Sequence, residues 1–89
     1  MVIHADTMSE FKQEKKKREE FQVCFGKHLK KLREDKGISG AELARRSYMD
    51  KPNITRLEKG RINPSLYILK QICEALEIRL DELMKDFNY

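Results

Sequence analysis

The chain has no tryptophan, only two prolines and two cysteines, and no extended apolar run among its 89 residues. A helix that crosses a bilayer needs about 20 mostly apolar residues, and we find neither such a segment nor the pattern of a signal peptide. Two cysteines are also too few for the disulfide framework of a small secreted domain. We therefore expect a soluble cytoplasmic protein with no membrane partner.

Residues with the chemistry of a catalytic or metal site are scarce as well. Cys24 and Cys73 fall in amphipathic helical patterns, where we expect reduced thiols that fill the core. Cys24 and His28 are one helical turn apart, but two ligands are too few to hold a metal. The sequence has no serine–histidine–aspartate set and no glycine loop for phosphate, so it predicts no enzyme, cofactor or small-molecule substrate. We expect His28 to be partly buried.

Positive charge is concentrated in the middle of the chain. Residues 22–64 carry eleven Lys and Arg against five Asp and Glu, a net +6, whereas residues 1–21 are neutral and residues 65–89 carry −2. A local excess of this kind is typical of a surface that binds a polyanion. The bias needs support from other features, because many solvated helices are basic.

Residues 1–20 are predicted to form a charged N-terminal arm, and residues 21–89 the folded domain. Between Glu10 and Glu20 the only apolar residue is Phe11, so this segment has no face to bury. Its mixture of Glu and Lys favours helix, which leaves two alternatives, a flexible solubilising arm and a solvated extension of the first helix. The run Lys15–Lys17 can also reach a phosphate.

Apolar periodicity predicts an all-α fold of five helices, with no strand pattern. The first helix spans about residues 21–36 and Gly37 ends it, the fourth opens at Ser65, and the fifth spans about residues 80–87. The stripe of the first helix consists of Phe21, Phe25, Leu29 and Leu32. The apolar residues of the fourth, at helical spacing, are Leu66, Leu69, Ile72, Cys73 and Leu76, and the fifth carries Leu80, Leu83, Met84 and Phe87 on one side.

The second helix is short. Ser39 can cap its N-terminus, and Glu42, three residues on, completes the sequence signature of a capping box. The helix is predicted to end near Ser47, with Leu43 and Ala44 facing inward.

The third helix follows after a turn at residues 48–49. Asp50 can cap it, Pro52 lies in its first turn, where a missing N–H does no harm, and Gly60 ends it. Ile54 and Leu57 define its inward side. The opposite face is short, polar and basic, with Pro52, Arg56 and Lys59.

Two short helices joined by a tight turn within a five-helix bundle are typical of a helix-turn-helix, whose second helix enters the major groove of duplex DNA. Ala44 supplies the small residue needed where the two helices cross. The motif segments are LREDKGIS at 32–39, ELA at 42–44, ITRLEKG at 54–60, NPS at 63–65 and AL at 75–76. In order and spacing they resemble the Cro and lambda-repressor-like helix-turn-helix family, also called the xenobiotic-response-element type, across roughly residues 26–84.

The resemblance implies a transcriptional regulator that binds double-stranded DNA, which we expect to act as a repressor on the nucleoid. By position in the family, the base-contacting residues are Lys51, Pro52, Thr55 and Arg56. The residues that hold backbone phosphates are Ser39, Asn53, Lys59 and Arg61. Arg can donate two hydrogen bonds to guanine, whereas phosphate contacts position the domain without reading sequence.

Arg33 and Glu58 match a family ion pair that joins the first helix to the third, so we expect them to be structural. Three positions depart from the family. Gly40 replaces a common glutamine and removes a phosphate contact, Tyr48 replaces the glycine usual in the turn, and Pro52 brings no donor to the third helix. A non-glycine residue at position 48 must adopt a positive φ or shift the turn.

We expect the regulator to bind a two-fold symmetric operator as a homodimer, whose copies read half-sites one helical turn apart, about 34 Å. Apolar residues near the C-terminus predict the dimer interface, namely Met84, Phe87 and Tyr89, with Tyr67 or Ile68 adding to it. The alternative is that these residues only close a small core. A second interpretation of the whole chain is an antitoxin-like or adaptor module that binds a protein partner.

Overall fold

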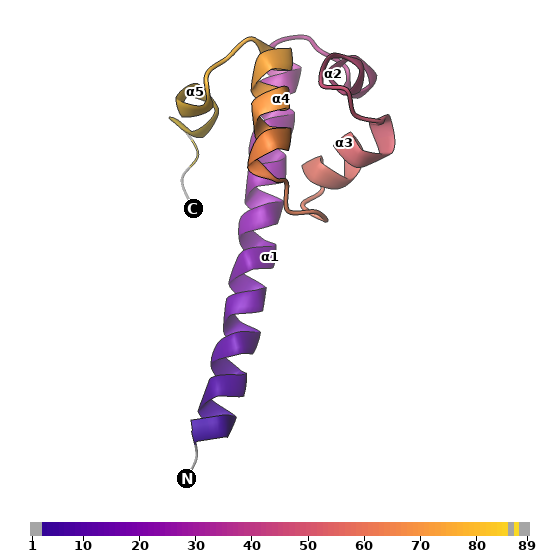
Figure 1. Ribbon diagram of the computed structural model, residues 1–89. Helices are drawn as coiled ribbons and strands as arrows, with labels where there is room; N and C mark the ends of the chain where they lie inside the picture. The colour runs from indigo at the N-terminus through magenta and orange to yellow at the C-terminus, as the bar shows by residue number, and fades with distance from the viewer. Residues whose placement is uncertain (1–2, 86, 88–89) are drawn as a thin grey trace.

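The computed structural model describes residues 3–85 and 87, with side chains from residue 8 onward. Its five helices are α1 (Ile3–Asp35), α2 (Gly40–Arg46), α3 (Lys51–Glu58), α4 (Leu66–Leu76) and α5 (Leu80–Lys85), and the described part of the chain has no strand (Figure 1). The predicted all-α class and the order of five helices are confirmed.

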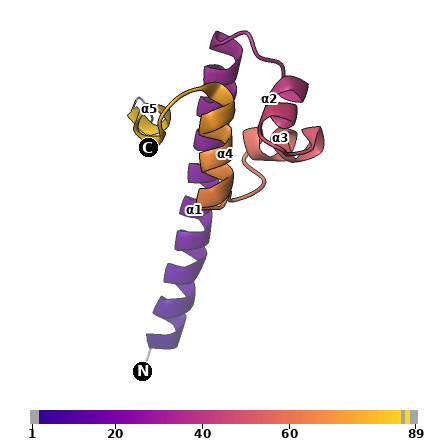
Figure 2. The same cartoon turned by 45° about the horizontal axis from the view of Figure 1, so that its top comes forward.

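Helix α1 is one continuous helix of 33 residues. Its N-terminal half projects from the compact part of the molecule, residues 21–85, which we call the head (Figures 1 and 2). Helices α2 and α3 lie on one side of it, α5 lies on the other, and α4 crosses the upper half of α1 in both views. The arm is therefore an extension of the first helix, the second of the two alternatives, because its Lys and Glu residues favour helix and nothing interrupts it.

The core lies where all five helices meet. Phe25 and Leu29 of α1 are buried, as their spacing predicts, whereas Phe21 lies at the edge and stays 41% exposed. The other buried apolar residues are Leu43, Ala44, Ile54, Leu57, Ile72, Cys73, Ala75, Leu76 and Leu83.

Three residues that follow the apolar pattern do not reach the core. Leu66, at the start of α4, is 71% exposed, Leu80 of α5 is 44% exposed, and Cys24, a predicted core thiol, is exposed on α1. Met84 is 36% exposed and borders a cavity of about 130 Å³ together with Phe21, Phe25 and Leu69. Only Cys73 is a core thiol, and burial raises its pKa.

Side-chain caps define the starts of three helices, and the caps at Ser39 and Asp50 are as predicted. The Oγ of Ser39 accepts from Glu42 N at 3.0 Å, the carboxylate of Asp50 from Asn53 N at 3.0 Å, and the Oγ of Ser65 from Ile68 N at 3.1 Å. At α2, only the serine half of the predicted capping box forms, because the Glu42 carboxylate accepts hydrogen bonds from Arg45 and Arg46 instead.

Tyr48 takes the left-handed conformation at the turn between α2 and α3, with φ 58°, and its side chain is 87% exposed. The turn is closed by a hydrogen bond from Met49 N to Ala44 O at 2.9 Å. Of the two outcomes expected for a non-glycine residue here, the chain adopts the positive φ, at a cost of about 1 kcal/mol.

Two contacts fasten α5 to α1. His28 Nε2 lies 2.6 Å from the backbone oxygen of Leu83, and His28 is half-buried as expected. The Phe87 ring packs edge-on against Phe21 at 5.3 Å and Phe25 at 5.6 Å between centroids. Phe87 therefore closes the core of its own chain.

Candidate nucleic-acid interface

The position of α3 depends on a close approach of its C-terminal turn to α1. A Cβ at Gly26 would lie 2.4 Å from the backbone oxygen of Glu58, and a Cβ at Gly60 would lie 2.4 Å from the Cα of Val23. Only glycine leaves room for this packing, and Gly60 also has a φ of 74°. Gly26 is a structural determinant that sequence reasoning missed, because a glycine inside a helix gives no local sign of what packs against it.

Arg33 and Glu58 form a two-point ion pair between α1 and α3. Arg33 Nε donates to Glu58 Oε2 at 2.7 Å and Nη2 donates to Oε1 at 3.0 Å, and both side chains are about nine-tenths buried. Arg33 Nη1 also donates to the backbone oxygen of Ile38 at 2.8 Å. The hydrogen bond to Glu58 raises the pKa of Arg33. One guanidinium thus joins α1, the segment before α2, and α3.

The face of α3 opposite Ile54 and Leu57 is open to solvent. Arg56 is exposed, and its Nη1 donates to Asn53 Oδ1 at 2.9 Å, which fixes the guanidinium on the outer surface. Thr55 is half-buried at the edge of this face. The remaining exposed residues of the outer face are Lys51, Pro52 and Lys59.

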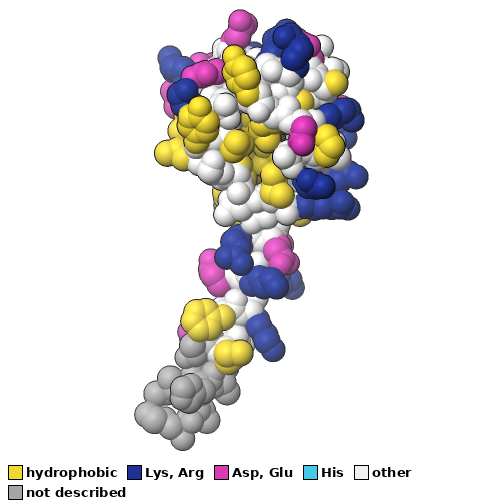
Figure 3. Space-filling view, turned by 45° about the vertical axis from the view of Figure 1, so that its right-hand side comes forward, with side chains coloured by type: hydrophobic (Ala, Val, Ile, Leu, Met, Phe, Trp, Pro, Cys, Tyr) yellow, Lys and Arg dark blue, Asp and Glu magenta, His cyan; other side chains and the backbone are white. Residues whose placement is uncertain are grey.

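A groove of about 590 Å³ runs between α1 and α3 beside this face. Six cations line it, namely Lys27, Lys30 and Arg33 from α1 and Lys51, Lys59 and Arg61 from α3 and its following loop, together with Glu58, the partner of Arg33. In the space-filling view, the dark blue side chains of Lys and Arg gather along the right-hand edge of the head (Figure 3). Sequence reasoning missed Lys27 and Lys30, although their spacing of three residues already placed them on one face of α1.

The N-terminus of α2 borders the same groove through Gly40, whose nearest neighbour for a Cβ is Lys51 Cε at 3.9 Å. Ser39, the predicted phosphate contact, is exposed and uses its Oγ as the acceptor of the α2 cap, so its hydroxyl proton remains the group that can donate. The Glu42 carboxylate accepts hydrogen bonds from Arg45 and Arg46, which lower its pKa to about 2.

The structure brings most of the predicted site residues to one surface. Lys51, Thr55, Lys59 and Arg61 share the groove, and Arg56 lies on the outer face of α3. Among the described residues, no three His, Cys, Asp or Glu side chains are placed to hold a metal ion. None of the described helices combines the length and apolar character needed to span a bilayer.

These features define a class: a helical domain whose helix-turn-helix presents a short basic helix to the outside, the arrangement with which proteins enter a DNA groove. The helix-turn-helix family pattern matches residues 29–83, and the chain belongs to this family, the xenobiotic-response-element type. Its members are DNA-binding transcriptional regulators and not enzymes, so this chain is a DNA-binding transcriptional regulator.

Named relatives agree with this class. The control protein C.MunI of a Mycoplasma species is 35% identical over 70 residues, which are 78% of this chain and 95% of C.MunI. The restriction-modification controller protein C.AhdI of Aeromonas hydrophila superposes with a TM-score of 0.68 at 37% identity, covering 70% of this chain and 94% of C.AhdI. The clp gene regulator ClgR of Corynebacterium glutamicum superposes with a TM-score of 0.69 at 29% identity, covering 73% of this chain and 83% of ClgR.

Proposed function

We propose that the protein represses transcription as a homodimer on a two-fold symmetric operator, on the nucleoid in the cytoplasm, with α3 of each copy in the major groove. The exposed Arg56, held by Asn53 on the outer face of α3, is the observation that carries the proposal. With Nη1 held by Asn53, the Nε and Nη2 donors are free to pair with the two acceptors on the edge of a guanine.

The surface divides into residues that read bases and residues that hold phosphates. Base contacts are assigned to Lys51, Pro52, Thr55 and Arg56. Phosphate contacts are assigned to Ser39, Asn53, Lys59 and Arg61, and the basic groove adds Lys27 and Lys30. The Arg33–Glu58 pair joins α1 to α3 and is assigned to the support of α3, with no role in reading sequence.

The test is a selection of bound sequences from a pool of random duplex DNA by the chain alone. The expected result is one recurring site with two-fold symmetry and half-sites about 34 Å apart. A pool that yields no common sequence contradicts specific recognition by this chain, and favours an antitoxin-like or adaptor module that needs a protein partner.

The dimer interface is proposed around Met84, with Phe87 and Tyr89 as its predicted neighbours. Met84 is exposed on α5, whereas the Phe87 ring packs against Phe21 and Phe25 of its own chain, and Tyr89 lies outside the described residues. Tyr67, 62% exposed on α4, is a predicted addition to this surface. Sedimentation that shows only monomer at micromolar concentration, with and without operator, contradicts the dimer.

A second candidate names the genes under control. C.MunI and C.AhdI are controller proteins matched over nearly their whole length, which favours control of restriction-modification genes by this chain as well. The measurement is binding to the promoter DNA of the genes that neighbour its own, with transcript levels in its presence and absence. Specific sites found only at unrelated promoters would contradict this candidate and leave operator binding intact.

A further inference from the structure

The first 18 residues of α1, residues 3–20, which we call the stalk, lie outside the family fold. The family pattern begins at residue 29, and the matches to C.MunI and C.AhdI leave 22% and 30% of this chain uncovered while covering nearly all of those proteins. Every described side chain of the stalk, from residue 8 to 20, is exposed, so this part of the stalk contributes nothing to the core. Its function must come from what its surface binds.

Charges on the stalk are segregated by face. At 100° per residue, Lys12, Lys15, Lys16 and Arg18 fall on one side together with Glu19. The other side carries Glu10, Glu14 and Glu20 together with Lys17. The first face, which we call the basic face, therefore has a net charge of +3 and the opposite face has −2. A helix kept only for solubility has no need of this separation.

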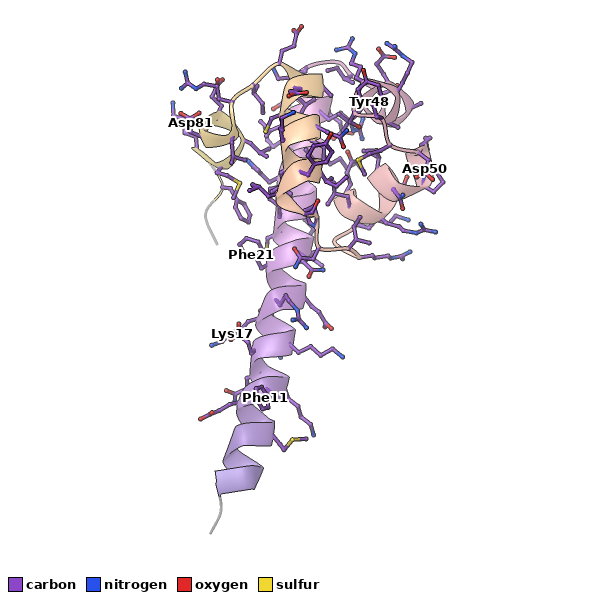
Figure 4. All side chains as sticks on the ribbon, viewed as in Figure 1. Phe11, Lys17, Phe21, Tyr48, Asp50 and Asp81 are labelled. Atoms are coloured by element: carbon purple, nitrogen blue, oxygen red, sulfur yellow. The ribbon has the colours of Figure 1, made fainter. Side chains whose placement is uncertain are left out.

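The basic face points to the same side as the DNA-binding surface. Arg18 and Glu19 line a groove of about 440 Å³ that separates the stalk from the loop containing Lys59 and Arg61. Gln22 fixes this geometry, because its Nε2 donates to the backbone oxygen of Gly60 at 3.3 Å. Lys17 points away from the side on which α3 lies (Figure 4).

We propose that the basic face of the stalk is a second DNA-binding surface, which holds backbone phosphates of the duplex next to the half-site read by α3. The proposal rests on the proposed function, since α3 places the duplex on this side of α1. Eighteen helical residues extend about 27 Å, the length of about eight base pairs. The acidic opposite face repels phosphate and so fixes which side of the stalk meets the DNA.

The test compares two single substitutions on the same solvated helix, Lys15→Gln on the basic face and Lys17→Gln on the opposite face. Affinity is measured against salt concentration on duplexes that carry the selected site with and without ten flanking base pairs. Lys15→Gln is expected to reduce the salt slope on the flanked duplex by about 0.9 per copy, about 1.8 for the bound dimer, through the loss of one phosphate contact in each copy, and Lys17→Gln to leave it unchanged. Trimming the flanks should weaken the unsubstituted protein and remove the difference between the variants.

Four outcomes would overturn the proposal. Equal slope reductions for the two variants would mean that only overall charge matters. An unchanged slope for Lys15→Gln would mean no contact, as would a hydroxyl-radical footprint confined to the half-sites. A shift of the dimer equilibrium by Lys15→Gln without any change in DNA affinity would assign the stalk to contact between two copies. The same slope comparison on a flanked duplex of arbitrary sequence separates this failure from failure of operator recognition.

Discussion

At the scale of single residues, Arg56 and Arg61 separate sequence reading from phosphate binding. Arg56→Ala removes the exposed guanidinium on α3 and should cost about 1–3 kcal/mol of operator binding while relaxing preference at one base position. Arg61→Ala, in the basic groove, should weaken all sequences alike and reduce the salt slope by about 0.9 per copy, about 1.8 for the bound dimer. Binding titrations on the selected site and on single-base variants check both. Discrimination that survives Arg56→Ala would show that the reading face is misplaced.

Tyr48 carries a conformational cost that glycine would not. Its φ of 58° lies in the left-handed region and its side chain is 87% exposed, so Tyr48→Gly removes strain and little packing. The free energy of unfolding in urea should rise by about 0.5–1 kcal/mol. Tyr48→Ala is the matched control, because alanine removes the same side chain but keeps the strained positive φ, so stability should not rise. A loss of stability in both variants would mean that Tyr48 stabilises the turn.

At the scale of helices, the Arg33–Glu58 pair holds α3 to α1. Arg33→Ala leaves a carboxylate that is about nine-tenths buried without its partner, so stability in urea should fall by about 3 kcal/mol. Lys31→Ala is the control, since the Lys31–Asp35 pair at 3.0 Å is exposed and its loss should cost no more than about 0.5 kcal/mol. Equal small losses would show that the buried pair is not what holds the two helices together.

Gly26 sets how closely these helices approach. Gly26→Ala places a methyl group 2.4 Å from the backbone oxygen of Glu58, so α3 must move and stability should fall by about 1–3 kcal/mol with a loss of operator affinity. Gly40→Ala is the control, because its new Cβ meets nothing closer than 3.9 Å. Denaturation and DNA titration of both variants measure the two effects. A neutral Gly26→Ala would mean that α1 and α3 can separate at no cost.

At the scale of the whole molecule, the head and the stalk should be thermodynamically independent. Residues 8–20 bury no side chain, so deletion of residues 1–16 should change the melting temperature by less than about 2 °C. The same deletion removes Lys12, Lys15 and Lys16 and should lower the salt slope on flanked DNA, if the stalk binds phosphates. A large drop in melting temperature would place the domain boundary nearer the N-terminus than residue 21.

Local signals determined the helices. The capping side chains of Ser39, Asp50 and Ser65 each accept a hydrogen bond from the N–H three residues further along, so four consecutive residues are enough to specify each cap. The family motifs likewise predicted an ion pair, and the structure has Arg33 bonded to Glu58. Periodicity predicted the buried Phe25 and Leu29, because a stripe with a helical period must face the core wherever that core lies.

The tertiary structure alone decided which apolar residues are buried and which surfaces lie together. Leu66 and Leu80 follow the helical period and remain exposed, since none of the described elements covers them. Phe87, beyond the end of α5, packs its ring against Phe21 and Phe25 of its own chain, which its place in the helical pattern did not reveal. Lys27 and Lys30 join the cations of α3 only because Gly26 lets α1 approach it. Contacts between distant segments depend on shape at both surfaces, and no short stretch of sequence contains both.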